Sequence, residues 1–206
     1  MRRTVNIFCV IVSLLILNGC SPSALDAVSY IRWVENEDNE LQVSKEVDGF
    51  EFSLQYKPVP YIILTENNGD YPGTTTYQKR RDEIDGMQYY TLRISSDKDH
   101  DLLRAGVRDD NEYYSRLEYF TSIMQDDIEL VDGEDTLACV LYHYERNYNL
   151  SPKTSFVLGF ENNPDRKNAG ERTLIFHDQV FGVGTIKLSI SEDNITNAPA
   201  LTDEAL

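Results

Sequence analysis

The dipeptide Asp48-Gly49 separates two segments in which apolar and polar residues alternate. The apolar positions are Leu41, Val43 and Val47 before the dipeptide, and Phe50, Phe52, Leu54 and Tyr56 after it. Alternation with a period of two places apolar side chains on one face of a β-strand. Asp-Gly favours tight turns between antiparallel strands because both turn residues need a positive φ. The sequence therefore predicts a β-hairpin in this region.

Further strand-like segments follow, separated by polar turns. They are Tyr61–Leu64, Met87–Ser95, Ile128–Val131, Thr136–Tyr144, Thr154–Phe160, Arg172–Phe176 and Gly184–Ile190. Val28–Val34 fits a strand or a short helix. Because most of these segments follow one another directly, antiparallel pairing is simpler than parallel pairing through crossover helices. We expect a mainly β, antiparallel, β-sandwich-like domain, with an α+β fold as the alternative.

One segment has a helical pattern. Asp109 and Glu112 resemble a capping box, in which a side chain at each position satisfies a backbone N–H of the first turn. The apolar residues at helical spacing are Tyr113, Leu117, Phe120 and Met124. We predict one amphipathic helix over residues 111–125, packed on the sheets. It ends before Asp126 and Asp127, whose charges oppose the negative end of a helix dipole.

The N-terminus has the order of an export signal, with Arg2 and Arg3, an apolar run from Ile7 to Leu17, and small residues before Cys20. The basic residues stay on the cytosolic side while the apolar run inserts. The run is too short for a transmembrane helix, which needs about 20 apolar residues. We therefore predict a cleaved signal peptide over residues 1–19.

The sequence Leu17-Asn18-Gly19-Cys20 resembles the lipobox of bacterial lipoproteins, in which a signal peptidase cleaves before the cysteine. The resemblance covers residues 1–20 and implies that Cys20 is lipidated and anchors the chain in a membrane. Asn18 departs from the Ala, Ser or Thr that the family usually has there. Ser21 replaces the Asp that retains lipoproteins in the inner membrane, and this favours the outer membrane over the inner one. Two or more acyl chains hold a protein on a membrane stably.

Cleavage before Cys20 leaves 187 of the 206 residues, which is the size of one compact domain. We expect a lipidated cysteine and a short tether over residues 20–27, and a single strand-rich domain over residues 28–192. A polar tail over residues 193–206 is expected to end loosely.

The chain is acidic, with 35 Asp and Glu against 19 Lys and Arg and a net charge of −16. Loss of Arg2 and Arg3 with the signal peptide brings the net charge to −18. This charge repels phosphate backbones, so we expect no nucleic-acid partner, and it favours a cationic partner. Lys79-Arg80-Arg81 is the one basic cluster of the mature chain. It predicts either an anion contact or a solvated turn balanced by neighbouring acids.

The cysteines and histidines match no catalytic motif. Cys139 and His143 stand four residues apart on a predicted strand, which separates them by about 13 Å, too far for a catalytic dyad. Cys139 is instead predicted to be a buried free thiol. His177-Asp178 suggests acid–base chemistry, but scattered histidines are usually structural. We therefore predict no catalytic residues, no cofactor and no enzyme activity.

Metal-binding patterns are also incomplete. His100, His143 and His177 lack the spacing of zinc ligands. Asp97, Asp99 and Asp101 alternate as in a calcium loop, but Leu102 and Arg108 stand where that loop has its glycine and its last carboxylate. We expect no metal site, with a weak calcium site among the acidic residues 126–135 as the alternative.

The chain has 13 tyrosines, which offer rigid apolar area with a polar tip. The clustered ones are Tyr89, Tyr90, Tyr113, Tyr114, Tyr142, Tyr144 and Tyr148. We predict a lipid-anchored, non-enzymatic envelope protein that binds another envelope protein, as an accessory subunit of a larger assembly. The alternatives are an acidic inhibitor or immunity lipoprotein that neutralises a cationic hydrolase, a glycan-binding surface lipoprotein, and a hydrolase.

Overall fold

The computed structural model describes residues 24–98, 101–146, 151–165, 167 and 170–202. The helices are α2 (Ala27–Glu35), η1 (Glu37–Asn39), α3 (Val59–Glu66), α4 (Thr74–Ile84), α5 (Asp110–Thr121), η2 (Ile123–Asp127) and α6 (Glu192–Thr196). The strands are β1 (Gln42–Val47), β2 (Phe50–Lys57), β3 (Met87–Ser96), β4 (Ile128–Asp132), β5 (Asp135–Ala138), β6 (Leu141–Glu145), β7 (Thr154–Glu161), β8 (Glu171–His177) and β9 (Thr185–Ser191). Cys20 and the predicted signal peptide lie outside the described residues.

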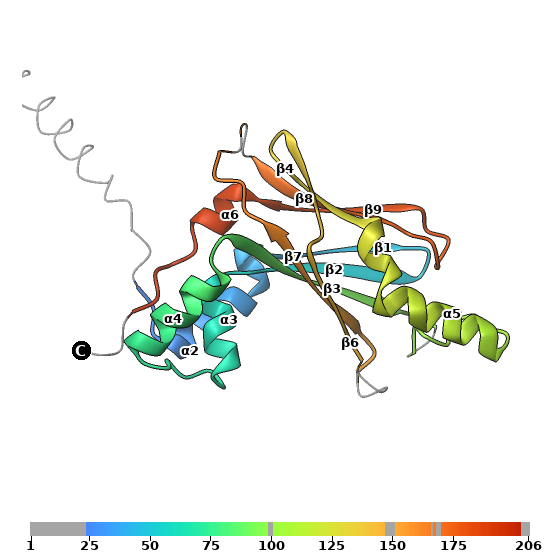
Figure 1. The fold of residues 1–206 in the computed structure, drawn as a ribbon, viewed down its shortest axis with the longest axis horizontal. Helices are drawn as coiled ribbons and strands as arrows, with labels where there is room; N and C mark the ends of the chain where they lie inside the picture. Colours follow the sequence, from blue (N-terminus) through green and yellow to red (C-terminus); the bar gives the residue numbers. More distant parts are fainter. Residues whose placement is uncertain (1–23, 99–100, 147–150, 166, 168–169, 203–206) are drawn as a thin grey trace, which may run out of the picture.

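The strands form two antiparallel sheets, with the orders β1-β2-β3-β7-β6 and β5-β4-β8-β9 (Figure 1). The two sheets pack face to face around one core. The buried residues of the five-stranded sheet include Phe52, Leu54, Tyr90, Leu92, Ile94, Phe156, Leu158 and Phe160, and those of the four-stranded sheet include Ile128, Leu130, Leu174, Phe176, Ile186, Leu188 and Ile190. Alternation along each strand gives this shared apolar layer. The prediction of a mainly β, antiparallel domain is confirmed.

The hairpin predicted at Asp48-Gly49 joins β1 to β2. Val47 pairs with Phe50, and the two turn residues have φ values of 52° and 83°. A Cβ at Gly49 would lie 2.7 Å from Oδ1 of the exposed Asp97, so that carboxylate would have to move. The turn therefore favours glycine chiefly because of its positive φ.

The structure corrects the prediction that Tyr61–Leu64 is a strand, because these residues lie in α3. Pro58 is the N-cap of the helix and Pro60 lies in its first turn. The backbone N–H groups of the first turn have no acceptor within the helix, so proline loses no hydrogen bond there. Tyr61 and Leu64 enter one apolar cluster and Ile63 enters another. A short run that is apolar all round fits a buried helix as well as a buried strand, so periodicity alone could not separate them.

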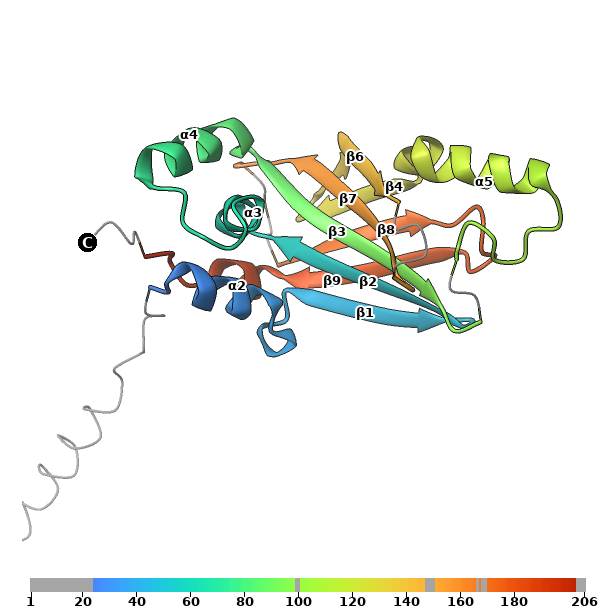
Figure 2. The same cartoon turned by 90° about the horizontal axis from the view of Figure 1, so that it is seen from below.

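The expected single helix is one of five α-helices in the described residues. Val28–Val34, which fitted either a strand or a helix, lies in α2, where Asp26 accepts a hydrogen bond from the backbone N–H of Ser29 at 2.9 Å. The basic cluster lies in α4. Figures 1 and 2 show α2, α3 and α4 together at one end of the domain.

The predicted amphipathic helix is present as α5. Asp109 caps it by accepting a hydrogen bond from the N–H of Glu112 at 3.0 Å, as the capping box indicated. The α-helix ends at Thr121, earlier than expected, and the 3-10 helix η2 then includes Asp126 and Asp127. Of the predicted apolar stripe, Phe120 and Met124 are fully buried, whereas Tyr113 and Leu117 are half-buried.

The C-terminal segment is more ordered than the expected loose tail. Residues from Glu192 form α6, and Leu201 pairs with Leu25 in a parallel bridge. The N–H of Leu25 donates to the carbonyl of Ala200 at 2.8 Å, and the N–H of Thr202 donates to the carbonyl of Leu25 at 2.7 Å. The two ends of the described chain therefore meet beside α2 and α6. No described helix is long and apolar enough to cross a membrane.

Candidate interaction surface

Four of the clustered tyrosines come together where α5 packs against β6. Tyr113 and Tyr114 lie on α5, and their rings are 5.4 Å apart. Tyr142 and Tyr144 lie on β6, and the Tyr144 ring is 5.7 Å from that of Phe120 on α5. Tyr148 lies outside the described residues. The packing of α5 on β6 thus brings Tyr114 and Tyr144 to one surface, while Tyr113 and Tyr142 are half-buried.

A groove of about 450 Å³ runs between α5 and β6. It is lined by Tyr114, Leu117, Glu118, Thr121, Tyr144 and Arg146, which we call the α5–β6 groove. The Tyr114 side chain is well exposed, with 64% of the residue accessible to solvent. An exposed tyrosine beside apolar area is typical of a protein-binding surface.

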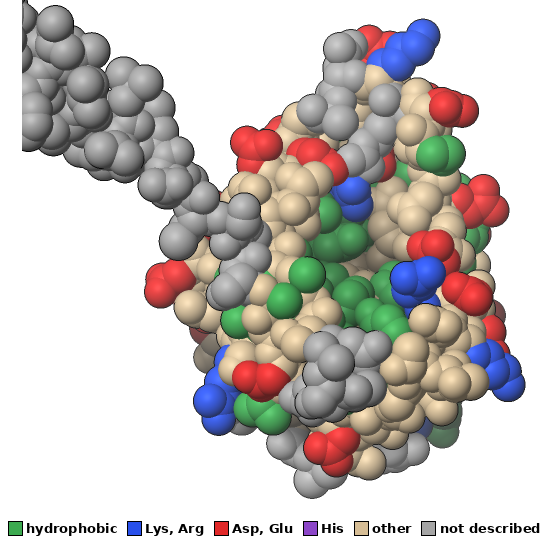
Figure 3. All heavy atoms as spheres, turned by 90° about the vertical axis from the view of Figure 1, so that its left-hand side faces the viewer, with side chains coloured by type: hydrophobic (Ala, Val, Ile, Leu, Met, Phe, Trp, Pro, Cys, Tyr) green, Lys and Arg blue, Asp and Glu red, His purple; other side chains and the backbone are tan. Residues whose placement is uncertain are grey.

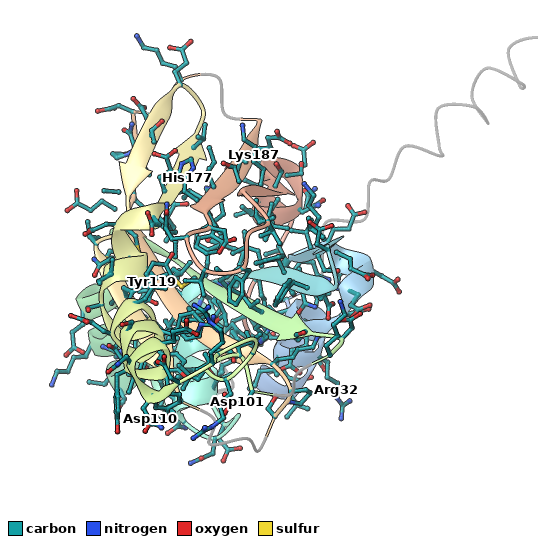
Figure 4. All side chains as sticks on the ribbon, turned by 90° about the vertical axis from the view of Figure 1, so that its right-hand side faces the viewer. Arg32, Asp101, Asp110, Tyr119, His177 and Lys187 are labelled. Atoms are coloured by element: carbon teal, nitrogen blue, oxygen red, sulfur yellow. The ribbon has the colours of Figure 1, made fainter. Side chains whose placement is uncertain are left out.

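Hydrogen bonds hold α5 firmly in place. The Tyr142 hydroxyl donates to the carbonyl of Phe120 at 2.6 Å, and the Tyr119 hydroxyl donates to Asp127 at 2.9 Å. Burial raises the pKa of both tyrosines, and Asp127 raises that of Tyr119 further. Figure 4 views this end of the domain, with Asp110 at the start of α5 and Tyr119 towards its end. The groove is therefore formed by elements that are already positioned.

Arg116 joins α5 to the segment that precedes it. Its guanidinium donates to the carbonyl of Leu102 at 3.1 Å and to the carbonyl of Ala105. The guanidinium of Arg104 lies 4.8 Å from the centre of the Tyr113 ring, within the range of a cation–π contact. These contacts hold residues 102–105 against the helix.

Cys139 and His143 are not joined by a hydrogen bond in the described chain. Cys139 is buried, and its Sγ donates to the carbonyl of Leu141 at 3.1 Å. Burial raises the pKa of the thiol to about 11. His143 is exposed on β6. The Cys139 environment is that of an unreactive thiol, because nucleophilic cysteines need a lowered pKa.

His177 and Asp178 have separate local contacts. The Asp178 carboxylate accepts hydrogen bonds from the backbone N–H groups of Val180, Phe181 and Val183, and so holds the connection between β8 and β9. His177 is exposed, with Nε2 3.4 Å from Glu129. Asp178 therefore organises a turn.

The candidate metal ligands do not gather. Among the described residues, no three side chains of His, Cys, Asp or Glu are placed to share a metal ion. Asp101 caps a turn by accepting from the N–H of Leu103 at 3.0 Å, while His100 and Asp99 lie outside the described residues.

The basic cluster on α4 is partly neutralised within the chain. Arg80 donates to both carboxylate oxygens of Glu66, at 2.7 and 2.8 Å, and to Glu83 at 3.2 Å. The hydrogen bond from Arg80 lowers the pKa of Glu66. Arg80 thus pairs with acidic side chains of the same chain, which agrees with the prediction that neighbouring acids balance the basic cluster.

A buried polar network that the sequence patterns did not predict joins the two sheets. Arg172 donates to the Gln88 side-chain oxygen at 3.0 Å and forms an ion pair with Glu192 at 3.0 Å. Gln88 donates to Asp132 at 3.1 Å, and the Tyr90 hydroxyl donates to Gln88 at 2.9 Å. Only 5% of Arg172 and 1% of Asp132 are exposed.

A signal for this network was present in the strand patterns. Arg172 falls in phase with the buried Leu174 and Phe176, and Asp132 falls in phase with Ile128 and Leu130. A charged residue at an inward position of an alternating strand indicates a buried partner of opposite charge. The partners themselves come from strands distant in sequence. Figure 3 views the end of the domain that carries α2, α3, α4 and α6, where hydrophobic side chains gather in a hollow.

Comparison with known proteins gives no relative for this chain: no family model, no curated protein and no solved structure matches it.

Proposed function

We propose that this chain is a lipid-anchored, non-enzymatic protein of the bacterial cell envelope that binds another envelope protein through the α5–β6 groove. In this role it acts as an accessory subunit of a larger assembly. The observation that carries the proposal is the exposed Tyr114 in a groove with Leu117 and Tyr144. Rigid tyrosines beside apolar area contribute strongly to protein–protein binding because they lose little conformational entropy.

The position of the groove also supports the proposal. Leu25 lies beside α2 and α6, whereas α5 lies at the opposite end of the long axis (Figures 1 and 2). Five residues lead from Cys20 to Leu25, and they span about 18 Å at most. A lipid on Cys20 therefore keeps the α2 and α6 end close to the membrane and leaves the groove free to meet a partner. The outer membrane is the proposed location because Ser21 follows Cys20.

The anchor is tested first. Cells that express the chain are labelled with a fatty-acid probe and fractionated. The native chain should carry the probe and sediment with outer membranes, and Cys20→Ala should do neither. An unlabelled native chain in the cytosol contradicts the anchor.

The groove is tested by crosslinking inside the cell. A photoreactive amino acid at Tyr114 should form a discrete product with one envelope protein, and Leu117→Arg in the same chain should abolish it. The control places the same amino acid at Val28, which is 50% exposed on α2 at the other end of the domain. Equal products from both positions, or none from Tyr114, contradict the proposed site.

The acidic-inhibitor alternative is favoured by the net charge of −16. It differs from the main proposal in its response to salt. Binding driven by opposite charges weakens steeply above physiological ionic strength, whereas binding through tyrosine and leucine changes little. Measuring the crosslinked fraction over a range of salt concentrations therefore separates these two functions.

A further inference from the structure

Residues 135–145 form one border of the sandwich. β5 is the outermost strand of the four-stranded sheet and β6 that of the five-stranded sheet, with Cys139 and Val140 between them. In the described part of the chain, β5 pairs only with β4 and β6 only with β7. Each strand thus has a second side on which no described strand lies. The backbone groups on such a side are a template for another strand.

This border lacks lysine and proline, two residues that often protect edge strands. Natural edges are blocked by lysines, prolines or inward-pointing charges. Residues 135–145 contain no lysine, arginine or proline, and their charged residues are Asp135 and Glu145 at the two ends. Between them, Val140 is 51% exposed and Leu141 is 37% exposed. The sequence of this border therefore permits strand pairing.

Charge indicates which kind of strand fits. Asp135 lies at one end of the border and Glu145 at the other, while Glu129 is paired opposite Ala138. Arg146 follows Glu145 and donates to the Tyr113 hydroxyl at 3.0 Å. A second copy of this chain would bring the same carboxylates and a further net charge of −16. A segment with lysine or arginine is complementary instead.

We propose that this border binds an extended segment of a partner protein by strand addition to β6. The segment has apolar residues at alternate positions and lysine or arginine near its ends. Because β6 forms one wall of the α5–β6 groove, the added strand lies against α5 and inserts a side chain beside Tyr114 and Tyr144. The inference rests on the proposed function and adds the mode of recognition.

The test uses the full lipidated chain in detergent micelles and a displayed library of short random peptides. Enriched peptides should alternate apolar and polar residues and carry lysine or arginine. Their binding should slow hydrogen exchange of the backbone amides in β6. Methylation of alternate backbone nitrogens of the peptide should abolish binding, because strand addition needs those N–H groups.

Two matched variants test the location. Val140→Lys places a lysine on the border and should weaken peptide binding about tenfold or more. Val28→Lys changes a valine of nearly equal exposure, 50% against 51%, on α2 and should leave binding unchanged. Both sites are exposed, so both variants are expected to fold.

Several results would overturn strand addition. They are a library that yields no binder, protection at a site other than β6, binding that survives backbone methylation, and a dimer of the chain alone that protects β6. If crosslinking at Tyr114 succeeds while the peptides fail, the proposed function stands and the strand-addition mode is rejected. If both fail, the proposed function is rejected as well.

Discussion

Replacing Arg172 by methionine should destabilise the domain more than any surface charge change. The substitution keeps an unbranched side chain but leaves the carboxylates of Asp132 and Glu192 without their cation. Both acids are shielded from water, with side-chain exposures of 1% and 15%. Breaking a buried ion pair by removing one partner costs about 3–5 kcal/mol. For a domain of this size that loss lowers the melting temperature by about 6–20 °C.

The assay is reversible urea unfolding of the chain with Cys20→Ser, followed by tyrosine and Trp33 fluorescence. Arg81→Met is the matched control, since Arg81 pairs with Asp82 at the surface, where 53% of the Arg81 side chain and 73% of the Asp82 side chain are exposed. Such a surface pair contributes about 0–1 kcal/mol. The double variant Arg172→Met with Asp132→Asn should recover part of the lost stability, because it removes one of the two carboxylates left without a cation. Equal stability of Arg172→Met and Arg81→Met would refute the reasoning.

Three further predictions concern single residues. Gly49→Ala should lower the free energy of unfolding in urea by about 1–3 kcal/mol, because φ is 83° and the new Cβ meets Asp97. At Gly182 a new Cβ would meet no atom within 4 Å. A loss at Gly49 smaller than that of Gly182→Ala would contradict the steric part of the reasoning. Thr91→Val should leave the free energy of unfolding unchanged or raise it by up to about 1 kcal/mol, since the buried Thr91 hydroxyl has no hydrogen-bond partner in the described residues. A clear loss of stability would mean that the hydroxyl does have a hydrogen-bond partner. Cys139 should react slowly with thiol reagents at neutral pH and faster as the pH approaches its pKa of about 11. Because the unfolded thiol has the lower pKa of 9.0, stability should also fall as the pH rises above 9; fast labelling of the folded chain at neutral pH would contradict the burial.

Some elements could be predicted from the sequence because their determinants are local. The hairpin at Asp48-Gly49 depends on two turn residues and on alternation beside them. The start of α5 depends on Asp109 and the backbone N–H of Glu112, which lie three residues apart. Local rules failed at Tyr61–Leu64, where the residues of a short apolar run pack against two separate clusters and only this packing selects the helix.

The sequence by itself determined the strand-rich class, the antiparallel pairing and the acidic charge, because alternation, turn residues and composition act over a few positions. Tertiary structure alone decided that Tyr114 would face Tyr144 across a groove and that Arg172 would meet Gln88, which is 84 residues away. It also decided that Leu201 would pair with Leu25 and so bring the C-terminal segment beside the N-terminal one. Contacts of this kind depend on which strands become neighbours, and the order of strands in a sheet is settled by the packing of the whole core.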